Sequence, residues 1–220
     1  VLVNQNELLQ QVAKEVAVCQ KCQLCYSRKN AVPGEGPADA EIMFIGEGPG
    51  FYENEQGRPF VGAAGKFLEE LLEKVGYARE QVFITNVVKC RPPGNRDPLP
   101  EELAACSGYL EEQITAIDPP VIVTLGRHSM GRYMPNARIS DIHGQARWVG
   151  GRLIVAMFHP AAALHQPSLK SVVMEDFSRL PDLLTQARAN REKMRMVPPE
   201  EEKTPPPPPP REDATQLSLF

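Results

Sequence analysis

The sequence has no apolar run of about 18 residues, the length that a membrane-spanning helix requires, so we expect no membrane span. It also has no excess of positive charge. The formal net charge is -4, so a nucleic-acid binder with this sequence needs a local basic patch. The first 19 residues lack the cationic start and continuous apolar core of a signal peptide and predict an amphipathic helix. With 42% hydrophobic residues, the composition is typical of one globular domain with appendages.

Cysteine is scarce but clustered, with three of the five cysteines in CQKCQLC, residues 19 to 25. An odd number of cysteines without an export signal argues against a disulfide framework. Cys19 and Cys22 form a C-x2-C pair, and Cys90 and Cys106 follow far downstream. Four thiolates of this kind fit zinc or an iron–sulfur cluster, and spacing alone does not separate the two. Two alternatives stay open: Cys25 can replace one member of the close pair, and Cys90 and Cys106 can be buried apolar residues.

Short apolar segments alternate with amphipathic ones along the chain. The segments predicted as strands are 41–46, 82–88, 121–126 and 153–158, and those predicted as helices are 4–18, 63–76, 100–117, 127–134 and 169–194. This alternation predicts an α/β fold, a three-layer α/β/α arrangement around a mainly parallel four-stranded sheet. Ligands of such sheets bind beyond the carboxyl ends of the strands. That rule selects GEGPG at 46–50, the segment 86–90 and His159, and it leaves Gly126 as a plain turn.

The segment GEGPGFYENEQGRPFVGAAGKFLEELL, residues 46 to 72, combines close-approach glycines, the carboxylates of Glu47 and Glu53, and the flat ring of Phe60. Together with ITNVVKCRPPGNRDPLP and MFHPAAALHQPSLK, it resembles the family 4 uracil-DNA glycosylases, the iron–sulfur type. The resemblance extends over about residues 14 to 190 in the same motif order. The resemblance therefore implies a uracil-DNA glycosylase-like fold.

The resemblance implies a [4Fe–4S] cluster held by Cys19, Cys22, Cys90 and Cys106, with zinc as the alternative occupant. Cys25 falls where relatives need no ligand. We expect the cluster to be structural, tying the N-terminal helix to the segment after the second strand, although a redox-sensing role stays open.

The resemblance also implies that a uracil nucleotide flips out of the DNA into a pocket. Phe60 matches the stacking aromatic, and Asn86 matches the amide that pairs with the uracil edge. Glu47 and Gly48 are expected to line the pocket. His159 is expected to donate to uracil O2 as negative charge develops during bond cleavage. Each of these residues alone is more often structural, and only their joint occurrence favours a site.

Gly48 stands where the GQDPY motif of family 1 enzymes has the Asp that orients water. Either Glu47 or Glu53 is expected to assist the water instead, and the sequence does not choose between them. RPPGNRDPLP carries no insertion of the kind that a related cross-linking group has. Simple hydrolysis that leaves an abasic site is therefore expected.

Basic and apolar residues near these motifs are candidate DNA contacts. Lys89, Arg91, Arg96 and Lys170 could meet phosphates. Leu164 or His165 is placed where a wedge could fill the gap left by the flipped base. A competing hypothesis is a non-catalytic iron–sulfur module for DNA binding or electron transfer, tethered to the sliding clamp. The combination of Asn86, Phe60 and His159 favours the enzyme, because a pure binder needs no base-sized pocket.

The C-terminal segment changes composition. We expect a domain over 1–195, a Pro-rich linker over 196–215 and a tail over 216–220, QLSLF. The tail resembles the bacterial sliding-clamp binding motif, with Gln216, Leu217, Leu219 and Phe220 as anchors. With the resemblance, the tail implies a cytoplasmic, nucleoid-associated DNA-repair enzyme. We expect a monomer, because the sequence has no heptad pattern and no obvious exposed apolar face.

Overall fold

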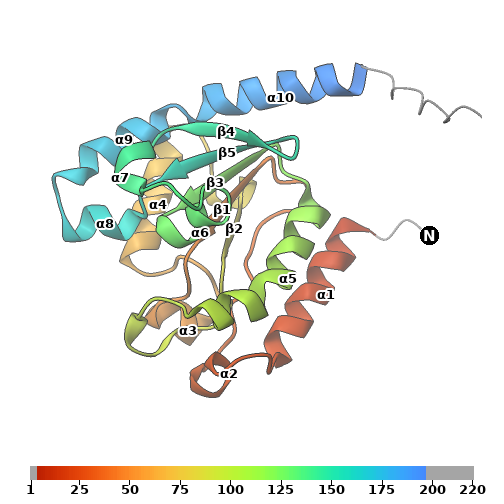
Figure 1. The fold of residues 1–220 in the computed structure, drawn as a ribbon, viewed down its shortest axis with the longest axis vertical. Coiled ribbons are helices and arrows are strands. Elements are labelled where there is room, and N and C mark those ends of the chain that lie inside the picture. Colours follow the sequence, from red (N-terminus) through yellow and green to blue (C-terminus); the bar gives the residue numbers. More distant parts are fainter. Residues whose placement is uncertain (1–3, 197–220) are drawn as a thin grey trace, which may run out of the picture.

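The computed structural model describes residues 4–196 and contains a five-stranded sheet of order β2-β1-β3-β5-β4 (Figure 1). Strands β1, β2, β3 and β5 run parallel, and β4 pairs antiparallel with β5 at one edge. The strands are β1 (Ile42–Gly46), β2 (Phe83–Asn86), β3 (Val121–Leu125), β4 (Ala146–Val149) and β5 (Arg152–Met157).

Helices surround this sheet in the described part of the chain. They are α1 (Gln5–Val18), α2 (Leu24–Ser27), α3 (Phe51–Gln56), α4 (Ala63–Lys74), α5 (Pro100–Ile117), α6 (Arg127–Gly131), α7 (Ile139–Ile142), α8 (Pro160–His165), α9 (Leu169–Ser178) and α10 (Leu180–Met196), with 3-10 turns η1 (Arg79–Gln81) and η2 (Pro93–Asn95).

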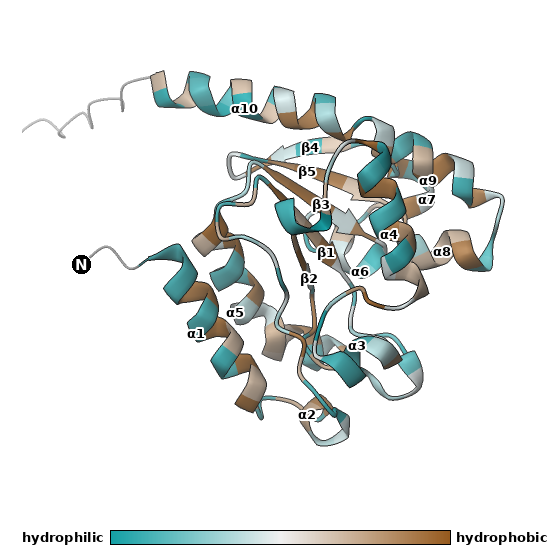
Figure 2. Cartoon of the chain, turned by 180° about the vertical axis from the view of Figure 1, so that it is seen from behind, coloured by the Kyte–Doolittle hydropathy of each residue, from teal (hydrophilic) through white to brown (hydrophobic). Residues whose placement is uncertain are grey.

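Successive residues of the central strands point to opposite faces of the sheet and build two cores. Ile42 and Phe44 of β1 join the core formed with α4, α9 and α10, whereas Met43 and Ile45 join the core formed with α5 and α6. Figure 2 shows the parallel strands β1, β2, β3 and β5 as largely hydrophobic, with helices of mixed polarity around them. This arrangement confirms the predicted three-layer α/β/α fold.

A third, smaller core lies between α1 and α5 and joins the two helices. Val12 and Val16 of α1 pack there with Tyr109, Cys90 and Cys106. The N-terminal helix is therefore an outer layer over α5, and its cysteine-containing end lies beside the segment that follows β2.

Two elements of secondary structure differ from expectation. The prediction of four strands missed β4, because all four of its residues are exposed at a sheet edge and carry no buried-strand pattern. The predicted helix over 169–194 is two helices, α9 and α10, separated at Arg179.

The linker and the tail, including Gln216, Leu217, Leu219 and Phe220, lie outside the described residues 4–196. Within that range, none of the helices has both the length and the apolar character that a membrane crossing requires.

Candidate active site and cysteine site

The carboxyl ends of the parallel strands meet at one edge of the sheet. Gly46 of β1 pairs with Asn86 of β2, and Leu125 of β3 pairs with Met157 of β5, two residues before His159. A cavity of about 840 Å³ opens at this edge. The predicted pocket residues that line it are Glu47, Gly48, Glu53, Phe60, Asn86 and His159. The structure thus brings all six together in one hollow.

The backbone of Gly46 lies very close to two of these side chains, Asn86 and Phe60. A Cβ atom at Gly46 would lie 2.4 Å from Asn86 Oδ1 and 2.8 Å from two ring atoms of Phe60. No side chain fits there, because real Cβ atoms do not approach other atoms so closely. The absence of a side chain at Gly46 therefore lets the amide of Asn86 and the ring of Phe60 share one end of the cavity.

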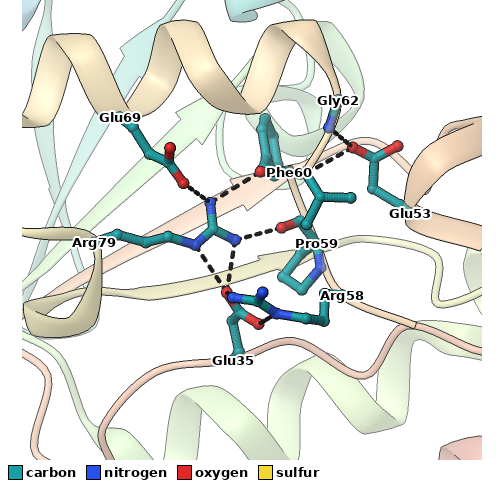
Figure 3. Close-up of polar contacts among 9 residues, drawn as sticks. Glu35, Glu53, Arg58, Pro59, Phe60, Gly62, Glu69 and Arg79 are labelled. Atoms are coloured by element: carbon teal, nitrogen blue, oxygen red, sulfur yellow. Dashed lines mark hydrogen bonds and ion pairs between the residues drawn. The ribbon is translucent and has the colours of Figure 1, made fainter. Parts of the chain in front are cut away.

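Phe60 is held in an unusual backbone conformation, with φ of +50°, which costs a non-glycine residue energy. The partly buried Arg79 donates to the Phe60 carbonyl at 2.9 Å and also to the carbonyl of Pro59. Arg79 is itself fixed by ion pairs to Glu35 at 2.6 Å and to Glu69 at 3.2 Å (Figure 3). These contacts hold the strained turn that aims the ring into the cavity.

Glu53 anchors the next two peptides of the same turn. Its Oε1 atom accepts hydrogen bonds from the backbone N–H groups of Val61 and Gly62, each at 2.9 Å (Figure 3). One carboxylate oxygen of Glu53 is therefore engaged in holding the Phe60 loop.

His159 precedes α8, and its Nδ1 atom accepts a hydrogen bond from the backbone N–H of Ala161 at 3.1 Å. In the neutral ring the proton is therefore on Nε2. Burial lowers the pKa of His159 to about 4, with a smaller opposing effect from Glu53. The ring stacks on Phe60 with centroids 5.4 Å apart. His159 is thus a neutral hydrogen-bond donor near pH 7.

Glu47 lies half-buried at the cavity wall, and burial raises the pKa of its carboxyl. His128 opposes this effect, since its Nε2 atom lies 3.7 Å from Glu47 Oε2 and 3.4 Å from Asp97 Oδ1. Arg127 forms an ion pair with Asp97. The sequence analysis missed His128 and Asp97. The position of His128 in the sequence indicates that it can belong to the site, because His128 follows β3 at the carboxyl edge of the sheet. The sequence analysis treats this segment, from Gly126, as a plain turn.

All five cysteines surround a second, much smaller cavity of about 10 Å³. This cavity lies between α5 and the segment that follows α1. Three sulfurs accept N–H hydrogen bonds, namely Cys19 from Lys21 at 3.5 Å, Cys90 from Arg28 at 3.2 Å and Cys106 from Lys89 at 3.3 Å. Burial raises the pKa of Cys22, and a backbone hydrogen bond with Leu24 opposes it. Such N–H donors stabilise ligating thiolates.

The spacing of the sulfurs bears on what they can hold. Within residues 4–196, no three cysteine sulfurs lie within 4.8 Å of one another. A tetrahedral zinc ion with Zn–S bonds of about 2.3 Å brings its sulfurs to roughly 3.8 Å apart. Among the described residues the cysteine sulfurs are therefore not already gathered around the position of a single zinc ion. Burial also raises the pKa of Cys106 to about 11, so a thiolate at this position requires compensating positive charge.

Comparisons with known proteins agree with this geometry. The model of the uracil DNA glycosylase superfamily matches residues 33–178. A "Type-4 uracil-DNA glycosylase" of Saccharolobus solfataricus is 50% identical, over 79% of this chain and 85% of that protein. Proteins of the same name from Sulfurisphaera tokodaii and Thermotoga maritima are 49% and 44% identical, over 80% and 81% of this chain and 84% and 95% of those proteins.

The chain belongs to the uracil DNA glycosylase superfamily. The superfamily model spans every predicted pocket residue and the downstream cysteines, while Cys19 and Cys22 precede it.

For this superfamily member, one expected DNA contact requires correction. Lys89 is only 1% exposed, so its ammonium cannot meet a phosphate. It donates instead to Thr85 Oγ1 at 2.6 Å, Gln113 Oε1 at 2.7 Å and the Asn86 carbonyl at 3.0 Å. Burial lowers its pKa to about 7. Lys89 therefore links the end of β2 to α5 inside the protein. A basic residue in a loop motif gives no sign of such burial, so the sequence predicts a DNA contact instead.

The other candidate DNA contacts lie at or near the surface. His165 and Arg96 line the cavity, and Arg96 pairs with Glu102 at 2.7 Å. Leu164 is 47% exposed on α8. The ammonium of Lys170 lies over the ring of Phe67.

Proposed function

We propose that the protein removes uracil from DNA by hydrolysing its N-glycosidic bond, leaving an abasic site for base excision repair. The observation that carries this proposal is the convergence of Asn86, Phe60 and His159 on one cavity at the carboxyl edge of the sheet. A cavity of this depth suits a nucleotide that has left the base stack. The names of the type-4 relatives support the same chemistry.

Three side chains divide the recognition of the base. The Phe60 ring provides a face for the pyrimidine, and the Asn86 amide offers a donor and an acceptor to its edge. Asn86 is 2% exposed, so an unmatched base leaves its polar groups unsatisfied. The Nε2–H of neutral His159 donates to uracil O2 as negative charge builds on the departing base, an interaction worth about 3 kcal/mol.

Water then attacks the cation-like sugar. Glu47 is the better of the two candidates for orienting this water, because an oxygen of Glu53 is engaged by two backbone N–H groups. The carboxylate of Glu47 also lies on the cavity wall, where His128 Nε2 is 3.7 Å from its Oε2 atom and a carboxylate oxygen of Asp97 is within 4.8 Å.

Cys19, Cys22, Cys90 and Cys106 would hold a [4Fe–4S] cluster. Such a cluster would supply a crosslink between the end of α1, the segment after β2 and α5. The convergence of the cysteines on one cavity and the N–H donors to three sulfurs support ligation by these thiolates, and the choice of a cluster over zinc follows from the resemblance to the iron–sulfur type. Visible absorbance and iron content of the purified protein test this assignment, and stoichiometric zinc without iron would refute it.

The expected wedge and clamp contacts belong to the same proposal. Leu164 on α8 is exposed near the cavity-lining His165, where it could occupy the space of the extruded base. Equal loss of rate in single and double strands for Leu164→Ala would contradict this role. The tail QLSLF would tether the enzyme to a sliding clamp on DNA in the cytoplasm. Pull-down of the clamp with and without residues 216–220 tests the tether.

The function itself is tested with a labelled oligonucleotide carrying one uracil. We expect alkali-sensitive cleavage at that position and release of free uracil, with no cleavage of matched thymine and cytosine oligonucleotides. A non-catalytic module for electron transfer or DNA binding predicts binding with no alkali-sensitive site.

A further inference from the structure

Two large aromatic side chains lie exposed at the mouth of the base cavity. Phe51 is 51% exposed and Tyr52 is 59% exposed, and both line the cavity beside Glu53. Their rings pack edge to face, with centroids 5.4 Å apart. The catalytic proposal assigns neither ring a task. Adjacent exposed aromatic rings at the rim of a cavity are typical of a surface that contacts a ligand.

The helix that carries them is firmly attached. Asn54 of α3 is buried, and its side chain accepts a hydrogen bond from the backbone N–H of Lys29 at 2.9 Å. The amide of Asn30 donates to the carbonyls of Asn54 and Glu55 at 2.9 and 3.0 Å. The rings of Phe51 and Tyr52 therefore project from a fixed base, which limits the entropy cost of stacking a ligand on them.

Positive charge lies on the same rim. The guanidinium of Arg91 sits 5.4 Å from the centre of the Phe51 ring, and its Nε donates to Asn95 Oδ1 at 2.7 Å. Within residues 4–196, the structure pairs Arg91 with no carboxylate, whereas Arg96 and Arg127 on the same rim form ion pairs with Glu102 and Asp97. Arg91 therefore remains available to a phosphate.

We propose that Phe51 and Tyr52, with Arg91, form a stacking platform for the nucleotide that flanks the extruded uracil. The platform accepts a flanking base on an aromatic face and its phosphate on Arg91, the combination by which proteins grip single strands without reading sequence. A flanking base is free to stack there only where its partner strand is absent or opened, so the platform favours uracil in single strands. This inference rests on the proposed function, because it takes uracil-containing DNA as the occupant.

The test uses full-length protein and single-stranded oligonucleotides that carry 2′-fluoro-deoxyuridine, which resists cleavage, with 2-aminopurine on its 5′ or 3′ side. Stacking quenches 2-aminopurine fluorescence. We expect quenching on one side with the unaltered protein. The double variant Phe51→Ala and Tyr52→Ala should lose this quenching and bind about tenfold more weakly.

Two controls separate stacking from misfolding. Tyr26→Ala removes an exposed aromatic ring that does not line the cavity, and it should change neither binding nor quenching. The variant Phe51→Trp and Tyr52→Phe keeps two rings and should retain both.

Unchanged affinity and quenching in the double alanine variant would overturn the platform, as would an equal loss of binding to single-stranded and double-stranded probes. Excision from an unmodified uracil oligonucleotide is measured in parallel. Its absence in the unaltered protein refutes the proposed function, whereas the quenching and affinity readouts judge the platform separately.

Discussion

The base cavity and the cysteine site differ in construction, although only residues 87 to 89 separate Asn86 of the first from Cys90 of the second. The cavity is about 840 Å³ and its shape depends on close backbone approach, a strained turn and ion pairs. The cysteine site has a cavity of about 10 Å³ and is enclosed by buried apolar residues and N–H donors. The first is built for a ligand that enters and leaves, and the second for a group that stays. Substitutions in the first should therefore change chemistry, and those in the second should change stability.

The largest expected effect is on chemistry at the cavity. His159→Ala removes the Nε2–H donor aimed at the departing base, so we expect the single-turnover excision rate to fall by about 10²- to 10³-fold. Asn86→Ala should lower the rate similarly, because the uracil edge loses its polar partner. Quenched-flow excision assays measure both rates. The thermal midpoint and the visible absorbance should be nearly unaltered, and a parallel loss of absorbance would show that the two sites are not separable.

The second prediction concerns the cysteine site. Cys90→Ser or Cys106→Ser removes a buried ligand, and we expect loss of visible absorbance and a fall in the thermal midpoint of roughly 10 °C, because ligand binding contributes to folding. Cys25→Ser is the matched control from the same cavity and should change little. Absorbance and calorimetry measure the effect. If Cys25→Ser also loses the absorbance, the ligand set inferred from the resemblance is wrong.

The third prediction tests the connection between the two sites. Lys89→Met keeps the volume of the side chain but removes the ammonium that donates to Thr85, Asn86 and Gln113. We expect the free energy of unfolding in urea to decrease by about 1–3 kcal/mol. Because the Asn86 carbonyl loses its partner, the Michaelis constant for uracil-containing DNA should rise as well. A change in stability alone would show that Lys89 serves only the interior.

A region can be predicted from the sequence when its signal lies within a short, contiguous segment. The four parallel strands and the pocket residues Phe60, Asn86 and His159 come from short motifs at strand ends, and each motif is contiguous. Arg79 donates to the Phe60 carbonyl and is held by Glu35, which lies 44 positions away, and no local pattern indicates that pair. Lys89 was misjudged for a related reason, since burial against Gln113 depends on tertiary packing of α5.

The smallest expected effect distinguishes two titratable groups of the cavity, His159 and Glu47, by pH. Burial lowers the pKa of His159 to about 4, so this residue stays neutral from pH 5 upward and gives the excision rate no acid limb there. Burial raises the pKa of Glu47 above its ordinary value, so protonation of Glu47 should slow excision as pH falls through that raised pKa. Glu47→Gln should flatten this limb and lower the plateau rate by only about tenfold, because water attacks after the glycosidic bond has largely broken.

Rates between pH 4.5 and 8 measure the limb, and Glu53→Gln is the matched variant. The second substitution should weaken the hold on the N–H groups of Val61 and Gly62 and thereby raise the Michaelis constant, while keeping the acid limb. A limb that disappears in Glu53→Gln and persists in Glu47→Gln would reverse the assignment of the two carboxylates. We expect no such titration from the cysteine site, since its proposed role is to hold the segment that follows Asn86, the last residue of β2.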